Sequence, residues 1–208
     1  METTTKLDKH TEFEVKFRAD DIKLEDFRDV VKSLPNLKKV IFVSGPDFYF
    51  VKPDGSFARF RKPEYGHTSG GNEVTVKEKT EGHKNNIIRK EVNWKVNGTP
   101  DATIWEGLQM MGFAYNFSIN KDCHIFIFDD ATAVYYTVTD TTDSKKKKTE
   151  AFIEIEVKEE TIGNLTEDQA WLVVEKYEKA LESLGLSAQK RLKKSLYEMY
   201  VRGDSKNA

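Results

Sequence analysis

The sequence has little of what several common kinds of site require. Its 208 residues include one cysteine, Cys123, and four histidines. A single cysteine cannot form an internal disulfide, which indicates a reducing compartment, so we expect a cytoplasmic protein. So few sulfur and imidazole ligands also exclude a Cys/His zinc site. A bound metal would have to be held by carboxylates, which favours Mg²⁺, Mn²⁺ or Ca²⁺.

Neither charge nor hydrophobicity is concentrated in one part of the chain. With 33 basic and 35 acidic residues, the formal net charge is −2, which excludes the strongly basic balance typical of nucleic-acid binders. No apolar run approaches the roughly 20 residues of a membrane span, and the polar N-terminus lacks the apolar region of a signal peptide. We therefore expect no membrane contact. The length predicts a single domain, 1–208, with its core at about 10–201.

Short runs of alternating apolar and polar residues dominate the chain. The clearest are Thr11–Arg18 and Ala151–Lys158, in which most polar positions are charged. A period of two is typical of a strand with one apolar face and one polar face. We expect further strands at 38–51, 56–62, 73–80, 87–96, 117–128 and 133–139, the first of them divided into two runs near Gly45-Pro46.

Helical spacing of apolar residues is confined to a few segments. It predicts helices at 21–34, 99–112, 166–184 and 188–201, and Thr166-x-x-Gln169 forms a capping box at the start of the third. Strands outnumber helices, so the expected fold class is α+β around a large antiparallel sheet, either open or closed into a barrel.

The charges on the expected strands are segregated by sign. Carboxylates alternate at Glu12/Glu14 and Glu154/Glu156, whereas the strands between them carry mainly Arg and Lys. Charged residues on one strand are ordinarily explained by a solvated sheet face. A solvated face more often mixes signs, and Glu and Lys are not favoured strand residues. Inside a barrel, the glutamates would need a compensating cation and the basic wall would bind a polyanion such as a phosphate chain.

A series of short motifs resembles one known family. Glu12-Phe13-Glu14-Val15-Lys16 resembles the ExExK signature of the CYTH, or triphosphate tunnel metalloenzyme, superfamily. Motifs similar to the family's later ones follow in its order at 47–50, 57–61, 75–77, 89–91, 111–113, 152–156 and 194–197. The resemblance implies an eight-stranded antiparallel β-barrel with flanking helices. It also implies that the tunnel binds a triphosphate together with Mg²⁺ or Mn²⁺.

The resemblance further implies roles for individual residues. The implied metal ligands are Glu12, Glu14, Asp140, Glu154 and Glu156. The implied substrate contacts are Lys16, Arg59, Arg61, Lys77, Lys79, Arg89 and Lys121. Tyr49 and Lys77 resemble a pair proposed to be catalytic in thiamine triphosphatases. The chain departs from the family at Lys121-Asp122-Cys123, where members usually have Lys-x-Arg.

Three functions agree with this resemblance. The first is metal-dependent hydrolysis of a nucleotide or another organic or inorganic triphosphate. The second is the class IV adenylate cyclase reaction, which makes cyclic AMP from ATP. The third is a nucleotide- or polyphosphate-binding module that has lost catalysis, for which the missing arginine at Cys123 is the sequence support. We expect a small-molecule partner, nucleic acid only as a 5′-triphosphate end, and a monomer or homodimer.

Overall fold

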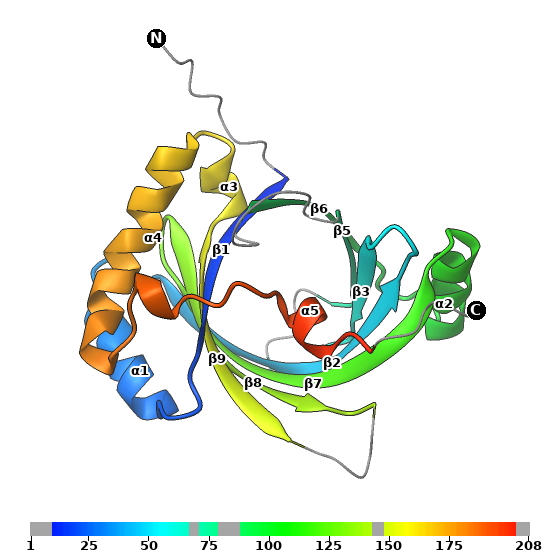
Figure 1. The fold of residues 1–208 in the computed structure, drawn as a ribbon, viewed down its shortest axis with the longest axis horizontal. Helices are drawn as coiled ribbons and strands as arrows, with labels where there is room; N and C mark the ends of the chain where they lie inside the picture. Colours follow the sequence, from blue (N-terminus) through cyan, green and yellow to red (C-terminus); the bar gives the residue numbers. More distant parts are fainter. Residues whose placement is uncertain (1–9, 67–70, 79–87, 143–147, 203–208) are drawn as a thin grey trace.

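The computed structural model describes residues 10–66, 71–78, 88–142 and 148–202, and its architecture is a closed β-barrel flanked by helices (Figure 1). The strands are β1 Thr11–Arg18, β2 Lys39–Val51, β3 Phe57–Arg61, β4 Tyr65–Gly66, β5 Glu73–Lys77, β6 Ile88–Lys95, β7 Ala114–Ile127, β8 Ala131–Asp140 and β9 Thr149–Val157. Eight of them close in the order β2-β3-β5-β6-β1-β9-β8-β7 with antiparallel pairing throughout, and β4 adds to one end of β2. The predicted α+β barrel is therefore confirmed.

The helices lie outside the barrel or across its mouth. They are α1 Leu24–Lys32, α2 Asp101–Met110, α3 Glu159–Ile162, α4 Glu167–Leu181 and α5 Leu196–Tyr200, with 3₁₀ turns at Glu182–Leu184 and Ala188–Lys190. Figure 1 shows α1, α3 and α4 on one side of the barrel, α2 on the opposite side, and α5 over the opening. None of the described helices has the length and apolar character that a bilayer crossing requires.

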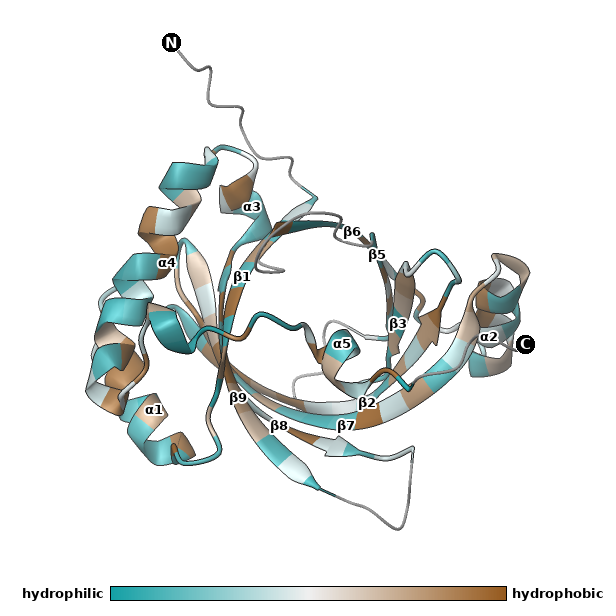
Figure 2. Cartoon of the chain, viewed as in Figure 1, coloured by the Kyte–Doolittle hydropathy of each residue, from teal (hydrophilic) through white to brown (hydrophobic). Residues whose placement is uncertain are grey.

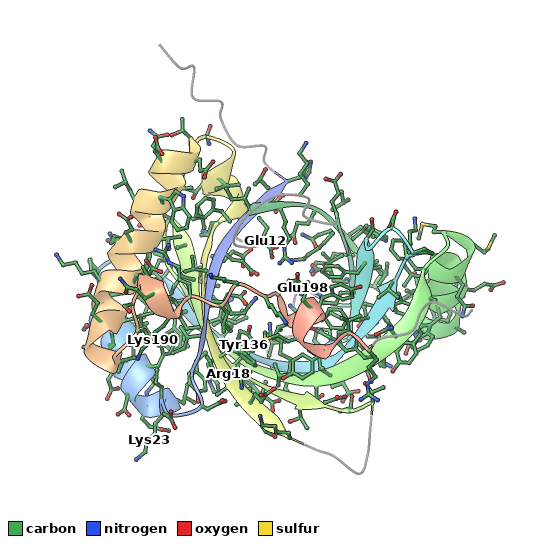
Figure 3. All side chains as sticks on the ribbon, in the orientation of Figure 1. Glu12, Arg18, Lys23, Tyr136, Lys190 and Glu198 are labelled. Atoms are coloured by element: carbon green, nitrogen blue, oxygen red, sulfur yellow. The ribbon has the colours of Figure 1, made fainter. Side chains whose placement is uncertain are left out.

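The main hydrophobic core lies between the barrel and α4 (Figure 2). Phe13 and Phe17 of β1 are fully buried there, and the Phe13 ring meets Trp171 edge-on at a centroid distance of 5.0 Å. Because side chains alternate across a strand, burial of these phenylalanines against the helices turns Glu12 and Glu14 into the barrel. In Figure 3, Glu12 points into the barrel, whereas Lys23 and Lys190 lie outside it.

The expected division of β2 near Gly45-Pro46 is wrong, because one strand runs from Lys39 to Val51. The Pro46 carbonyl accepts a hydrogen bond from the Lys62 N–H at 3.0 Å, so the Pro46 nitrogen faces the edge where the partner chain passes from β3 to β4. Proline cannot donate a bond in return, and this is tolerated here because β3 has already ended at Arg61. A Cβ on Gly45 would lie 2.3 Å from the Lys62 carbonyl oxygen, so this close approach requires glycine.

The expected continuous helix at 188–201 is also wrong. Only Ala188–Lys190 and Leu196–Tyr200 are helical. Between them the chain is extended, since Arg191 forms a β-bridge with Phe17 and the Leu192 N–H donates to the Lys16 carbonyl at 2.7 Å. Ser195 then caps α5 in a capping box with Glu198. The pairing with β1 outweighs the apolar helical pattern and carries the chain across the barrel mouth (Figure 1).

Candidate functional site

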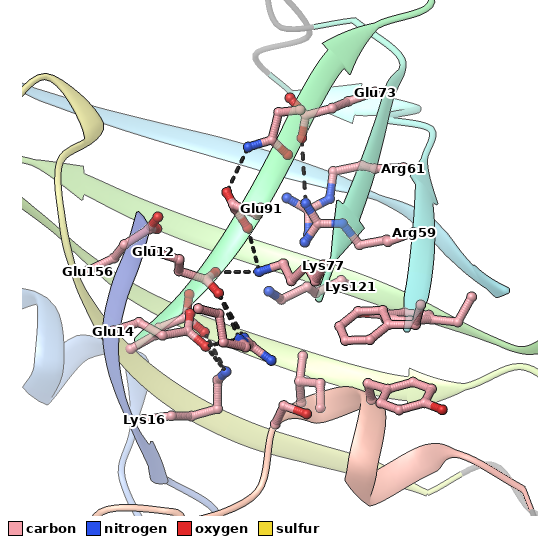
Figure 4. Close-up of a pocket in the computed structure, with 18 residues that line it drawn as sticks. Glu12, Glu14, Lys16, Arg59, Arg61, Glu73, Lys77, Glu91, Lys121 and Glu156 are labelled. Atoms are coloured by element: carbon pink, nitrogen blue, oxygen red, sulfur yellow. Dashed lines mark hydrogen bonds and ion pairs between the residues drawn. The ribbon is translucent and has the colours of Figure 1, made fainter. Parts of the chain in front are cut away.

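The barrel encloses a charged cavity of about 230 Å³ (Figure 4). The inward faces of the strands supply most of its walls, and Ser195, Leu196 and Tyr197 close it on the side of α5. Acidic and basic lining residues are equal in number. The acidic ones are Glu12, Glu14, Glu73, Glu91, Glu154 and Glu156, and the basic ones are Lys16, Arg59, Arg61, Lys77, Arg89 and Lys121. The predicted segregation of charge on alternating strand positions therefore has its origin in the barrel interior.

Four of the five predicted metal ligands meet in this cavity. Strand pairing places Glu14 opposite Glu156 and Lys16 opposite Glu154. Glu12 lies two residues before Glu14, on the same face of β1. Asp140 does not join them. It ends β8 opposite Ile119, and its carboxylate accepts from the Thr142 N–H and pairs with Arg202 Nη2 at 2.9 Å.

The basic side chains of β1, β5 and β6 are paired with these glutamates. Lys16 Nζ lies 2.9 Å from Glu14 Oε1 and 3.1 Å from Glu154 Oε2. Lys77 pairs with Glu12 and, at 2.7 Å, with Glu91 Oε2. Arg89 Nη2 lies 2.8 Å from Glu12 Oε2 and 3.1 Å from Glu14 Oε1 (Figure 4). This network neutralises most of the carboxylates.

Glu156 differs from the other three glutamates. Burial opposes ionisation of Glu154, but Lys16 and Lys121 hold the pKa of that carboxyl well below its usual value. Burial also opposes ionisation of Glu156, and the charges of Glu12 and Glu154 add to this effect, so its pKa lies well above the usual value. Among the described residues, no Lys or Arg forms an ion pair with Glu156. Glu156 is thus the carboxyl of this cluster that ionises least readily, and no described Lys or Arg balances its charge.

Two basic side chains on the facing wall have unused capacity for an anion. Arg59 Nη2 donates to Thr75 Oγ1 at 2.9 Å, but its buried Nε has no hydrogen-bond partner in the described part of the chain. Lys121 Nζ lies 3.8 Å from the Tyr136 ring centroid, and burial lowers the pKa of its ammonium group. A buried donor without a partner is costly, so Arg59 Nε favours occupation of the cavity by an anion, and Lys121 adds an ammonium group to the same cavity.

Asp47, Glu73 and Tyr136 shape the site but were not among the predicted site residues. The Asp47 carboxylate, 1% exposed, takes two parallel hydrogen bonds of 2.8 Å from Arg61 Nε and Nη2. Glu73 approaches Arg59, and the Tyr136 hydroxyl donates to Glu154 Oε2 at 3.1 Å. Asp47 could have been found from the sequence, because it lies two residues before Tyr49 on the same face of its strand.

Tyr49 and Lys77, the predicted catalytic pair, both line the cavity. No hydrogen bond joins these two described side chains. The Tyr49 ring stacks on Phe117 at 4.4 Å, and burial, with the charge of Asp47, raises the Tyr49 pKa to about 12. Its hydroxyl therefore stays protonated at neutral pH and is suited to donate a hydrogen bond. Lys77 is held by glutamates, and Lys79 lies outside the described residues.

The donors suit a hard divalent cation, although the side chains are not arranged as a metal site. No three described His, Cys, Asp or Glu side chains are placed to hold one ion. The reason lies in the network above, since Glu12, Glu14 and Glu154 turn toward Lys and Arg. Carboxylate oxygens are nevertheless what Mg²⁺ and Mn²⁺ prefer, and the unbalanced Glu156 fits such an ion.

Several solved structures of other proteins share the fold of this chain. The PH1012 protein from Pyrococcus horikoshii OT3 is similar over 90% of this chain and 98% of its own, with a TM-score of 0.64 and 23% identity. A "putative adenylate cyclase" from Vibrio parahaemolyticus is similar over 91% of this chain and 97% of its own, with a TM-score of 0.58 and 17% identity. The Mimivirus capping enzyme triphosphatase is similar over 86% of this chain and 89% of its own, with a TM-score of 0.50 and 16% identity.

At these identities the likeness shows the fold. The sequence matches no family model, and no curated protein matches it.

Proposed function

We propose that the protein is a metal-dependent hydrolase that acts on a triphosphate. The observation that carries this proposal is the charged cavity of the barrel, from here on called the phosphate cavity, where glutamates on β1 and β9 face basic side chains on β3 and β7. A wall of carboxylates and a wall of cations are the two parts that phosphoryl transfer needs.

The phosphate chain would bind first to the groups with unused donors. Arg59 Nε is such a donor, Lys121 Nζ lies over the Tyr136 ring in the same cavity, and Asp47 holds Arg61 rigidly beside them. Guanidinium and ammonium groups bind phosphate through charge-assisted hydrogen bonds. These contacts would neutralise the diphosphate that leaves when the terminal phosphorus is attacked.

Glu12, Glu14, Glu154 and Glu156 would hold Mg²⁺ or Mn²⁺. Such an ion, when bound, neutralises phosphate oxygens and lowers the pKa of a coordinated water. The glutamates become available when a triphosphate takes over Lys16, Lys77 and Arg89, because each of these cations now pairs with them. Anion and cation therefore replace the internal ion pairs together, with little change in net charge.

The class IV adenylate cyclase reaction is the second candidate. It is favoured by the overall likeness to the Vibrio parahaemolyticus structure, whose name describes a "putative adenylate cyclase". The two reactions would use the same cavity and differ in which phosphorus is attacked. Hydrolysis yields ADP and phosphate, whereas cyclisation yields cyclic AMP and pyrophosphate.

The experiment is product analysis with ATP and with inorganic triphosphate, in the presence of Mg²⁺, of Mn²⁺ and of EDTA. We expect metal-dependent release of phosphate. Glu156→Gln should abolish this activity while keeping or raising the unfolding temperature, because a neutral amide of the same shape replaces a carboxyl whose ionisation is opposed by burial, Glu12 and Glu154. Glu25→Gln, at an exposed position of α1, is the matched control and should behave as wild type.

Three results would contradict the proposal. Cyclic AMP as the product would favour the cyclase. Full activity in EDTA, or in Glu156→Gln, would remove the metal assignment. Metal-dependent binding of triphosphates without turnover would leave a binding module.

A further inference from the structure

The tunnel continues beyond the phosphate cavity into a second cavity of about 270 Å³, called here the apolar chamber. Arg61, Glu73 and Lys121 line both cavities, so they form the boundary between the two. Beyond this boundary most of the lining changes from charged to apolar. The apolar lining residues are Ile41, Val43, Pro63, Cys123 and Ile125. Two charged residues also lie there, but Asp47 is paired with Arg61 and Lys95 with Glu73.

Strand geometry places the chamber at the end of the tunnel away from α5. Inward positions on β7 run in steps of two from Lys121 through Cys123 to Ile125, and on β2 they run from Tyr49 back to Ile41. The residues of α5 line the phosphate cavity but are absent from the chamber lining in the described chain. A ligand that fills both cavities would therefore lie along the barrel axis.

The chamber is suited to an uncharged ring and poorly suited to phosphate. Aliphatic walls give a phosphate oxygen no hydrogen bond, and burial of an anion without a partner is costly. An apolar group gains by leaving water there. The volume of 270 Å³ lies near the lower end of small-ligand pockets, roughly 300–1,000 Å³, which suits a single heterocycle.

We propose that the apolar chamber takes the base of a nucleoside triphosphate, so that the enzyme prefers nucleotides over inorganic triphosphate. This inference rests on the proposed function and names its substrate class. Cys123 is the specificity-determining residue, because its small side chain, 6% exposed, lies one inward position beyond Lys121. A large side chain there would fill the chamber next to the phosphates without touching the glutamates of β1 and β9.

The test compares kcat/KM for ATP, UTP and inorganic triphosphate in wild type, Cys123→Phe and Cys123→Ser. We expect wild type to prefer at least one nucleotide over inorganic triphosphate by about tenfold or more. Cys123→Phe should lose that preference, with turnover of inorganic triphosphate unchanged. Cys123→Ser keeps the volume and should keep the preference.

A second variant guards against a folding defect in Cys123→Phe. Val43→Phe enlarges a chamber side chain on the neighbouring strand β2, directly across from Cys123, and should have the same selective effect. The inference is overturned if wild type prefers inorganic triphosphate over both nucleotides, or if both Phe variants lower all three activities equally while remaining folded. Absence of turnover for every triphosphate in wild type would instead refute the proposed function.

Discussion

At the scale of single residues, the most informative group is the guanidinium of Arg59. Its Nε is buried and unpartnered within the described chain, while its Nη2 is held by Thr75 and approached by Glu73. A donor in this position costs stability unless a ligand accepts from it. Arg59 therefore contributes more to ligand binding than to folding.

Arg59→Met should raise the KM for the triphosphate about tenfold or more, as expected for loss of a charge-assisted hydrogen bond. The free energy of unfolding should change by less than about 1 kcal/mol, because Glu73 keeps its pair with Lys95 at 2.6 Å. Steady-state kinetics and urea unfolding measure the two effects. Arg28→Met, at a position of α1 outside the barrel, is the matched control. A large loss of stability with an unchanged KM would contradict this assignment.

Residue-level prediction succeeded where a side chain follows strand periodicity alone. Glu12 and Glu14 point inward because Phe13 between them packs on α4, and this follows from alternation in one strand. Asp140 lacked such support, since the sequence does not show that Arg202 and Thr142 take up its carboxylate. Likewise, the pairing of Asp47 with Arg61 depends on the register of β2 and β3, which alternation does not determine.

At the scale of elements, local signals predicted most strands to within one to three residues at each end and failed where a distant partner decides. The bounds of β1 were predicted from its own alternation, and the capping box at Thr166 correctly starts α4. The 188–201 segment has a good helical pattern, but its middle pairs with β1, far away in sequence. The continuity of β2 through Pro46 similarly depends on where β3 gives way to β4.

Glu150 links three of these elements and makes stability depend on pH. Burial opposes its ionisation, but hydrogen bonds from Lys148, Tyr200 and Arg18 outweigh that effect and lower its pKa to about 2. Since the folded pKa lies below the unfolded value, the stabilisation is complete above about pH 5 and is lost as the pH falls toward 2.

Glu150→Gln should therefore reduce the loss of stability between pH 6 and pH 3 by about 1–2 kcal/mol relative to wild type. The variant should also be less stable than wild type at pH 6. Urea unfolding at the two pH values gives both quantities, and Glu25→Gln serves as the exposed control. Parallel acid profiles for wild type and Glu150→Gln would show that this link contributes nothing.

At the scale of the whole molecule, a net charge of −2 conceals a strongly charged interior. The phosphate cavity holds six acidic and six basic side chains, so its contribution to the total cancels. Composition alone could not reveal this interior, whereas alternation on successive strands did. A nearly neutral set of paired charges also means that neither an anion nor a cation alone is well accommodated.

Binding of metal and triphosphate should therefore be mutually dependent. We expect Mg²⁺ and a non-hydrolysable triphosphate together to stabilise the protein by about 1–3 kcal/mol more than the sum of their separate effects. Thermal unfolding with each ligand and with both measures this excess.

Mg²⁺ also binds triphosphate in solution, which would produce an excess without any metal site. Glu156→Gln leaves that association unchanged but weakens the proposed metal site, so the excess must fall in this variant. An equal excess in Glu156→Gln and wild type would mean that the barrel binds the metal–triphosphate complex through the phosphates alone.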